Sequence, residues 1–251
     1  ILAGEQSIDS LISSTLKVIN NTRTYLDRAN QDIKNVASLL EYKIQLDTSF
    51  NDLNALKLKV DNIRISGIGQ DQKEQEYILA INELKSIQDK IPSIITISNS
   101  LSLNQNLDYS ELLNPKSFEP NIKDAETAKI VIFNNLEDYQ ITASAKTINI
   151  RYVSGKQESF ILVKKTISSS STPNYILEYS PNGFSKILTT GTKLDENTIK
   201  YPSSVREIIY TVNGEILSIR NTKTIPIPDL SSIPSFPEVK CGDNVCNYNQ
   251  D

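Results

Sequence analysis

Residues 5–66 contain neither glycine nor proline, the two residues that most often interrupt a helix. Apolar residues recur along this stretch every three or four positions, the spacing that places them on one face of an α-helix. They are Ile8, Ile12, Leu16, Ile19, Leu26, Ile33, Ala37, Leu40, Ile44, Phe50, Leu53, Val60 and Ile63. The pattern predicts an amphipathic helix from Ser7 to about Ile65, on the order of 85 Å long. A compact domain has no need of so long a rod, so we expect half of a coiled coil or elongated bundle.

A second helix is predicted directly after Gly67 and Gly69, where the chain turns sharply. Apolar residues with helical spacing run from Tyr77 to Ile91, and Pro92 ends the helix. A short connection of this kind folds the second helix back antiparallel on the first. Residues 1–92 are therefore predicted to form a helical hairpin or coiled coil.

The first predicted helix is much longer than its partner, which leaves part of its apolar face without cover. The uncovered stripe runs from Ile8 to Leu40. Later segments of the chain or another copy of it must bury this stripe, and the sequence favours neither. The poor helix formers Asp47, Thr48 and Ser49 are the place where an interruption of the helix is favoured.

Residues 93–139 are predicted to connect two structural units. Ile94–Ile97 is compatible with a strand or with more helix. Residues 130–133 have the β-propensity of a strand, but Asp124 is a suitable N-cap and the apolar spacing after it favours a third helix that extends to about Tyr139.

Residues 140–224 change to the period of two that is typical of β-strands. Ile148–Tyr152 alternates apolar and polar residues, Ser154–Lys156 suits a turn, and Tyr175–Tyr179 reads as a further strand. Asn213–Gly214 has the composition of a type I′ turn, so a hairpin is predicted between 208–212 and 215–219. We expect an antiparallel β-sandwich of immunoglobulin-like type, which makes the whole chain α+β.

Composition argues against several chemistries. The 251 residues carry a net charge of −4 and include no histidine. Without histidine, Ser-His-Asp and Cys-His nucleophiles and most transition-metal sites are excluded. No basic block is present, so a nucleic-acid partner is not expected. The carboxylate pairs Glu137/Asp138 and Asp195/Glu196 are adjacent in sequence and read as solvated surface. We therefore expect neither an enzyme nor a bound cofactor.

Residues 225–251 are predicted to be a proline-rich linker followed by a cysteine motif. Cys241 and Cys246 are separated by four residues, which is not the spacing of a CxxC redox or zinc site. Their polar terminal setting favours an oxidised pair, with each other or with cysteines beyond Asp251. Oxidation implies an extracytoplasmic location. The alternative is two free thiols on a polar tail.

The segment Cys241-Gly242-Asp243-Asn244-Val245-Cys246-Asn247 resembles the start of a cysteine-rich C-G-D-G-x-C motif. That motif recurs near the C-termini of archaeal secreted and cell-surface proteins. Asn244 stands where the family usually has glycine, and the family's further cysteines do not follow. The resemblance implies an extracellular or cell-surface location, with a further stalk or membrane anchor downstream.

Three weaker features each have a reading that fits a surface protein and a plainer one. Asn20 begins the tripeptide Asn20-Asn21-Thr22, a glycosylation acceptor sequence. Residues 247–251 alternate oxygen ligands like the first half of a calcium loop, although a polar tail is the favoured reading. Residues 1–5 suit either the remnant of a secretory signal or a chain boundary.

These observations lead to a non-enzymatic extracellular structural or adhesive protein, which associates with itself or with another surface protein. Membrane attachment is expected only through an anchor outside this chain. A receptor-like ectodomain that binds a ligand is the main alternative. A hydrolase that uses two carboxylates is a third hypothesis, and it would require a deep pocket with two facing acids.

Overall fold

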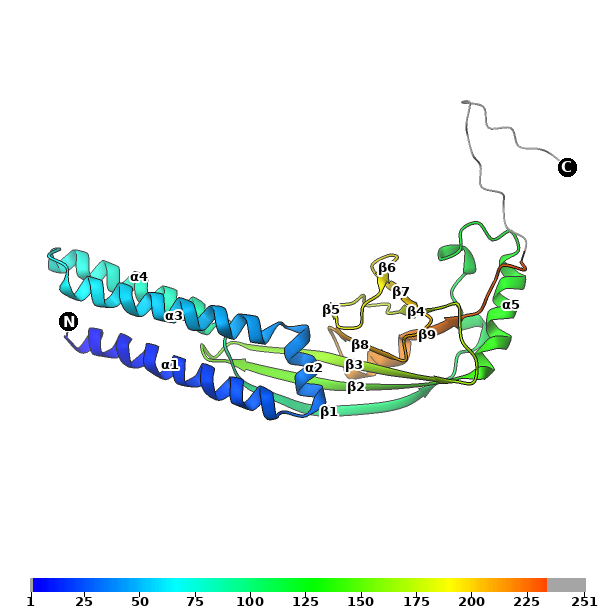
Figure 1. The fold of residues 1–251 in the computed structure, drawn as a ribbon, viewed down its shortest axis with the longest axis horizontal. Coiled ribbons are helices and arrows are strands. Elements are labelled where there is room, and N and C mark those ends of the chain that lie inside the picture. Colours follow the sequence, from blue (N-terminus) through cyan, green and yellow to red (C-terminus); the bar gives the residue numbers. More distant parts are fainter. Residues whose placement is uncertain (1, 234–251) are drawn as a thin grey trace, which may run out of the picture.

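A computed structural model describes residues 2–233, with side chains from Ser7 onward, and the chain is elongated (Figure 1). Helices occupy one end, and two antiparallel sheets occupy the other. The helices are α1 (Leu2–Arg28), α2 (Gln31–Leu39), α3 (Tyr42–Ile65), α4 (Gln70–Gln88) and α5 (Ala125–Asn135). The strands are β1 (Pro92–Gln105), β2 (Tyr139–Tyr152), β3 (Gln157–Ser169), β4 (Tyr175–Tyr179), β5 (Lys186–Ile187), β6 (Thr192–Lys193), β7 (Thr198–Pro202), β8 (Glu207–Val212) and β9 (Lys223–Ile227). The α+β class is confirmed.

The expected single helix from Ser7 to Ile65 is wrong, because the chain breaks twice to form α1, α2 and α3. Asn30 lies at the first break, where its side-chain oxygen accepts a hydrogen bond from the Ile33 amide (3.0 Å). This contact satisfies an amide that the start of a helix leaves unpaired. Glu41 lies at the second break with φ = 53°. Residues 47–49, where the sequence favoured an interruption, lie inside α3.

Glu41 occupies the left-handed conformation that normally ends a helix at glycine. A side chain in this region costs roughly 1–2 kcal/mol, which glycine avoids. We expect Glu41→Gly to raise the free energy of unfolding by up to about 1 kcal/mol, measured by urea denaturation. The control Glu74→Gly replaces an exposed residue inside α4 and should lower it by about 1 kcal/mol. Equal losses in both variants would contradict this account of Glu41.

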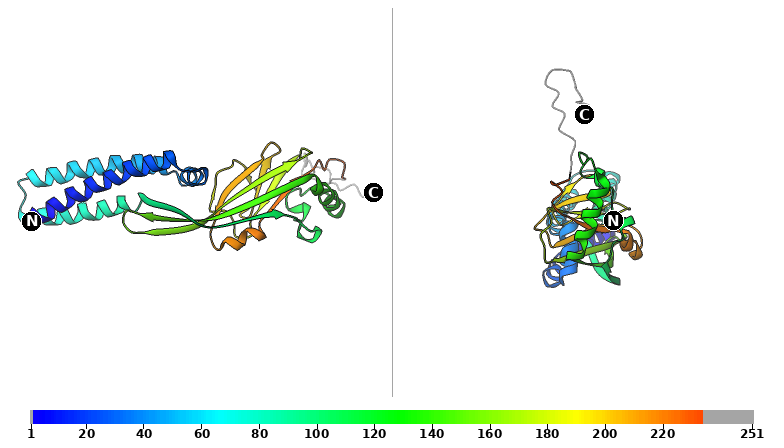
Figure 2. Two further views of the ribbon diagram at one scale, coloured as in Figure 1. Left: turned by 90° about the horizontal axis from the view of Figure 1, so that it is seen from below. Right: turned by 90° about the vertical axis from the view of Figure 1, so that its right-hand side faces the viewer.

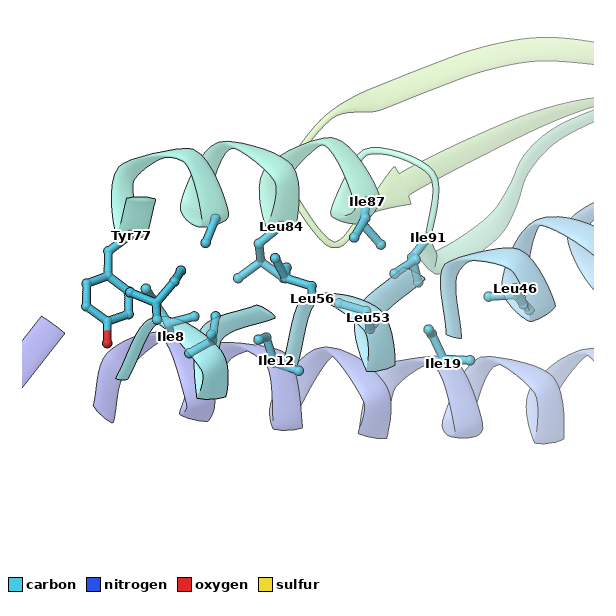
Figure 3. Close-up of a cluster of buried hydrophobic side chains, with 13 residues drawn as sticks. Ile8, Ile12, Ile19, Leu46, Leu53, Leu56, Tyr77, Leu84, Ile87 and Ile91 are labelled. Carbon is cyan, nitrogen blue, oxygen red and sulfur yellow. The ribbon is translucent and has the colours of Figure 1, made fainter. Parts of the chain in front are cut away.

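The apolar stripe of the N-terminal helices is covered by the chain itself. Ile8, Ile12 and Ile19 of α1 lie in one buried cluster with residues of α3 and α4, as Figure 3 shows. Ile33 and Val36 of α2 lie in a second cluster, against the strands. The antiparallel pairing of α3 and α4 is confirmed, and α1 packs beside them as a third helix (Figure 2). Of the two alternatives that the sequence left open, cover by the chain itself is the one observed.

The strands form one sheet of five strands and one of four. Their orders are β1-β2-β3-β8-β5 and β6-β7-β4-β9, and all pairs are antiparallel. The β2–β3 hairpin closes at Gly155, whose φ is 92°, so the predicted turn is confirmed. Ile94–Ile97 lies in β1, and the strand reading of it is correct. Asp124 caps α5 as predicted and accepts a hydrogen bond from the Thr127 amide (2.9 Å).

The hairpin predicted around Asn213–Gly214 is wrong. Gly214 does take a positive φ of 109°, but no strand follows it. Instead the chain forms a short 3₁₀ helix, η4 (Ile216–Asn221). The reason is that β8 already has a partner on each side, β3 and β5. A returning strand would have no free edge to pair with.

The five-stranded sheet buries opposite faces at its two ends. Towards the C-terminal end of the molecule, Ile161 and Val163 of β3 share a cluster with Ile176 of β4, so the two sheets pack on each other. Towards the helices, Phe160 and Leu162 face the opposite way and pack with α2. Because β3 is buried on both of its faces, its sequence is an uninterrupted apolar run and does not alternate with polar residues. The outer face of the four-stranded sheet packs against α5 and the short 3₁₀ helices η1 (Tyr109–Glu111) and η2 (Pro115–Ser117).

The predicted linker does not begin at residue 225. Residues 223–227 form β9, which is hydrogen-bonded to β4, and Ile225 and Ile227 are buried. Pro226 is tolerated because β9 is an edge strand, where a missing amide hydrogen breaks no sheet contact on the open side. The chain remains packed as far as Leu230 and Ile233.

Candidate functional site

The sequence-predicted site residues fall partly outside the described structure. Cys241, Cys246 and the half calcium loop at 247–251 lie beyond residue 233, so their pairing and ligation stay predictions. Asn20 is exposed on α1, whereas the hydroxyl of Thr22 is buried and donates to the Pro92 carbonyl (2.9 Å). Glycosylation of Asn20 stays a prediction as well.

The two carboxylate pairs lie at the surface, and one member, Glu137, lines a shallow pocket beside Leu136 and Tyr139. Glu137 and Asp138 are exposed after α5, and Asp195 and Glu196 are exposed in the loop after β6. The Asp195 Oδ1 accepts a hydrogen bond from the backbone amide of Asn197 (2.7 Å), which is an ordinary contact in a turn. Among the described residues, no helix is long and apolar enough to span a membrane.

A group of polar side chains, all of them buried except the partly exposed Gln105, lies between the two sheets, and we call it the inter-sheet cluster. Its members are Gln105, Lys165, Glu178, Tyr210 and Thr224. The side chains of Lys165 and Glu178 are both 0% exposed, and the Lys165 Nζ lies 2.8 Å from the Glu178 Oε1. Burying both charges carries a desolvation cost, and hydrogen bonds from each charged group to further polar groups offset part of it.

Each carboxylate oxygen of Glu178 accepts a hydrogen bond from a hydroxyl group. Tyr210 donates to Oε1 (2.6 Å) and Thr224 donates to Oε2 (2.5 Å). The Lys165 ammonium also donates to Oε1 of Gln105 (3.2 Å). Desolvation by burial lowers the pKa of Lys165, because the charged form loses its water. The same desolvation, with the Glu178 charge nearby, raises the pKa of Tyr210 well above its usual value.

Sequence reasoning overlooked this cluster, although the alternation of the strands carried a signal. Lys165 falls on the same face of β3 as Val163 and Ile167, which are core residues. Glu178 shares a face of β4 with buried Ile176 in the same way. A charge at a core position of an otherwise apolar strand face predicts a buried partner.

A pocket lies where α1, α2 and α3 meet, and we call it the elbow pocket. Its volume is about 810 Å³, and its walls include Leu26, Ala37, Ile44 and Leu46. Charged side chains of both signs line it. Arg23 pairs with Asp47 (2.5 Å), whereas Lys34, Lys43 and Glu41 form no ion pair among the described residues. The lining suits a small ligand that carries both charges over an apolar body.

The connection between α3 and α4 lies at the end of the helical bundle that is far from the sheets (Figure 1). Several apolar side chains of these two helices and of their connection are exposed. Leu58 and Ile68 line one shallow hollow together with Glu76. Ile65, at the end of α3, is 82% exposed. Leu79 is three residues after Glu76 and therefore on the same side of α4. We call Leu58, Ile65, Ile68 and Leu79 the tip surface.

Comparison of the chain with protein-family models, with curated proteins and with solved structures finds no match in any of the three. The function must therefore be argued from the residues themselves. The elbow pocket, the inter-sheet cluster and the tip surface are candidate sites in the described part of the chain.

Proposed function

We propose that this chain is a non-enzymatic extracellular structural or adhesive protein, and that two copies associate through their tip surfaces. The observation that carries the proposal is the placement of exposed apolar residues at one end of an elongated molecule. Leu58 is 66% exposed, Ile65 is 82% exposed and Leu79 is 54% exposed. Exposed apolar residues that cluster in this way are typical of a contact surface.

Charge at the tip favours a second copy as the occupant. Lys59 and Glu76 line the same hollow, and Lys59 also pairs with Glu83 (3.1 Å). A surface that holds both signs beside an apolar centre is complementary to itself under a twofold axis. Two chains joined in this way would form a longer rod with their sheets at opposite ends. Such a shape suits a spacer or the subunit of a filament.

The extracellular part of the proposal rests on the sequence. The resemblance of residues 241–247 to a motif of archaeal surface proteins supports it. We further propose that the two packed sheets act as an immunoglobulin-like sandwich, which is a common unit of surface proteins. Attachment to a membrane, in this proposal, comes from an anchor outside the chain.

A disulfide-trapping experiment tests the tip contact. In a chain with Cys241→Ser and Cys246→Ser, the variant Ile65→Cys places one thiol at the tip. We expect mild oxidation to give a covalent dimer rapidly, because the association brings two thiols together. Lys17→Cys, on the exposed side of α1, is the matched control and should remain mostly monomeric. Equal rates of dimer formation for the two variants would rule out a specific tip contact.

The elbow pocket favours a second candidate, a receptor-like ectodomain. Its lining combines apolar side chains with Lys34, Lys43 and Glu41, which form no ion pair within residues 7–233. A screen of amino acids and other small zwitterions by calorimetry tests this candidate. Binding that is lost in Lys34→Ala, with the fold retained, would favour the receptor over the structural protein.

A further inference from the structure

The inter-sheet cluster brings an amine, a carboxyl group and a carboxamide together, and the amine and the carboxyl group are fully buried. We propose that Lys165 and Gln105 condense into an intramolecular amide, with Glu178 as the group that moves the protons. The proposal rests on the geometry and burial of the cluster and does not depend on the proposed surface role.

The register of the sheet explains how the two side chains meet. Lys165 in β3 lies opposite Ala143 in β2, and Ala143 lies opposite Leu103 in β1. Gln105 is two residues beyond Leu103, on the same face of the sheet. Because Ala143 is small, the Lys165 side chain can pass over β2 and reach Gln105. Its Nζ lies 3.2 Å from the Gln105 Oε1.

Lys165 is prepared to act as a nucleophile. An amine attacks a carbonyl carbon only in its neutral form, and burial lowers the pKa of this amine. Glu178 is 2.8 Å from Nζ and is positioned to take the proton. Tyr210 and Thr224 hold the carboxylate in place through their hydroxyl groups.

Gln105 is held rigidly and its carbonyl group is polarised. The Gln105 Oε1 accepts a hydrogen bond from the Thr224 amide (2.9 Å), and the Gln105 Nε2 donates a hydrogen bond to the Thr224 carbonyl (2.8 Å). The Thr224 amide therefore points at the oxygen on which negative charge develops when the carbonyl carbon is attacked. A fixed backbone N–H in this position stabilises a tetrahedral intermediate.

The step balances without any additional reactant. The ammonium of Lys165 gives one proton to the Glu178 carboxylate, and the neutral Nζ then bonds to the Cδ of Gln105. The Cδ–Nε2 bond breaks, Nε2 takes a second proton that originates on Nζ, and ammonia leaves. The products are a Lys165–Gln105 amide and a protonated Glu178. The reaction replaces two buried charges by neutral groups, which removes their desolvation cost.

The new bond would join β1 to β3 across β2, next to the four-stranded sheet. It would close a covalent loop from Gln105 to Lys165 that includes α5 and the β2 strand. Such a cross-link restricts the unfolded chain in the same manner as a disulfide, but a reductant does not open it.

Intact-mass spectrometry of the full folded chain tests the proposal. We expect a mass lower than the sequence mass by one ammonia, about 17 Da, because the lysine amine displaces it from the amide. Tandem spectrometry of a protease digest should identify a peptide that joins Lys165 to Gln105. Succinimide formation at Asn182–Gly183 or Asn213–Gly214 causes the same loss, but it gives no joined peptide and is cleaved by hydroxylamine. An unmodified mass after prolonged incubation, or a loss located only at those asparagines, overturns the proposal.

Three variants assign the roles. Lys165→Met removes the nucleophile and should restore the full mass. Glu178→Gln removes the proton carrier and should do the same, with circular dichroism to confirm that the sheets remain folded. Lys164→Met is the matched control, because Lys164 lies on the other face of β3 and pairs with Glu207. It should keep the mass deficit of the wild type, and loss of the deficit in this control contradicts the assignment.

Discussion

We expect the protein to unfold cooperatively between about pH 10 and pH 12, because its buried tyrosines resist ionisation only while the chain is folded. The side chains concerned are Tyr42, Tyr152, Tyr175, Tyr201 and Tyr210, and all are at least 90% buried. Desolvation by burial is the largest cause of a raised pKa at each of them. For Tyr152 the pKa rises to about 12.

The direction of this pH effect follows from which state binds more protons. Below about pH 10 these tyrosines are protonated in both states, and their contribution to stability is fully present. Above it the unfolded chain ionises while the folded chain does not, so stability is lost as the pH rises. Each tyrosine then costs about 1.4 kcal/mol per pH unit, and together they rival the total stability of a typical domain. Lys165 has the opposite effect on stability, because its pKa is lowered in the folded chain and the unfolded chain therefore binds more protons. Its stabilising contribution rises with pH and becomes constant above about pH 10.4, where the unfolded chain also loses the proton.

Tyrosinate absorbance and circular dichroism, followed in one alkaline titration, measure this transition. We expect a steep rise in tyrosinate absorbance that coincides with the loss of secondary structure. Tyr201→Phe is the matched variant, because the Tyr201 hydroxyl is buried without a hydrogen-bond partner among the described residues. It should leave the stability at pH 7 unchanged or slightly raised, and it should move the alkaline midpoint upward. Gradual titration of all tyrosines near pH 10, with the fold intact, would contradict the account.

The second large effect is expected at the centre of the helical bundle. Ile12 of α1 is 0% exposed and lies between α3 and α4 (Figure 3). Removing its side chain leaves a cavity that the rigid neighbours fill only in part. We expect Ile12→Ala to lower the free energy of unfolding by about 2–5 kcal/mol, measured by urea denaturation.

The neighbouring residue on the same helix provides the control. Leu11 is 43% exposed, and Leu11→Ala should change the free energy of unfolding by no more than about 0.5 kcal/mol. A small effect at Ile12 would mean that α1 is not packed on α3 and α4. The stripe of α1 would then be free to bind another copy, as the sequence alone allowed.

Sequence reasoning predicted the helical region and its turn at Gly67 and Gly69 because the local signals there are strong and continuous. It missed the breaks at Asn30 and Glu41 because neither position carries a glycine or proline. Asn30 was a readable signal, since asparagine before an acidic first turn favours a helix start. Glu41 gave no local signal, and its left-handed conformation follows from the packing of α2 on the sheet.

The β region shows a different limit. The β2–β3 hairpin is local and was predicted, whereas the hairpin at Asn213–Gly214 depended on a free edge of β8. Whether an edge is free is decided by distant strands, in this case β3 and β5. Strand β9 was not predicted because it contains Pro226. Proline is typical of a linker, and it is tolerated in a strand only at the edge of a sheet, where β9 lies.

The candidate sites also depend on contacts between distant segments of the chain. The residues singled out for chemistry in the sequence, Cys241 and Cys246, lie outside the described part of the chain. The inter-sheet cluster joins Gln105, Lys165 and Glu178, which are far apart in sequence and meet only through the sheet register. Alternation within β3 and β4 could have marked two of them as buried, but not the contact between them.

The mass of the protein in solution, measured by light scattering over a concentration series, tests the proposed self-association most directly. The account predicts that the mass of the wild type rises above 28.1 kDa as concentration increases. It also predicts that the double variant Leu58→Glu/Ile65→Glu remains at the monomer mass, since both changes lie at exposed positions of the tip surface. A wild-type mass that stays at the monomer value throughout would contradict the account and would favour the ligand-binding reading of the elbow pocket.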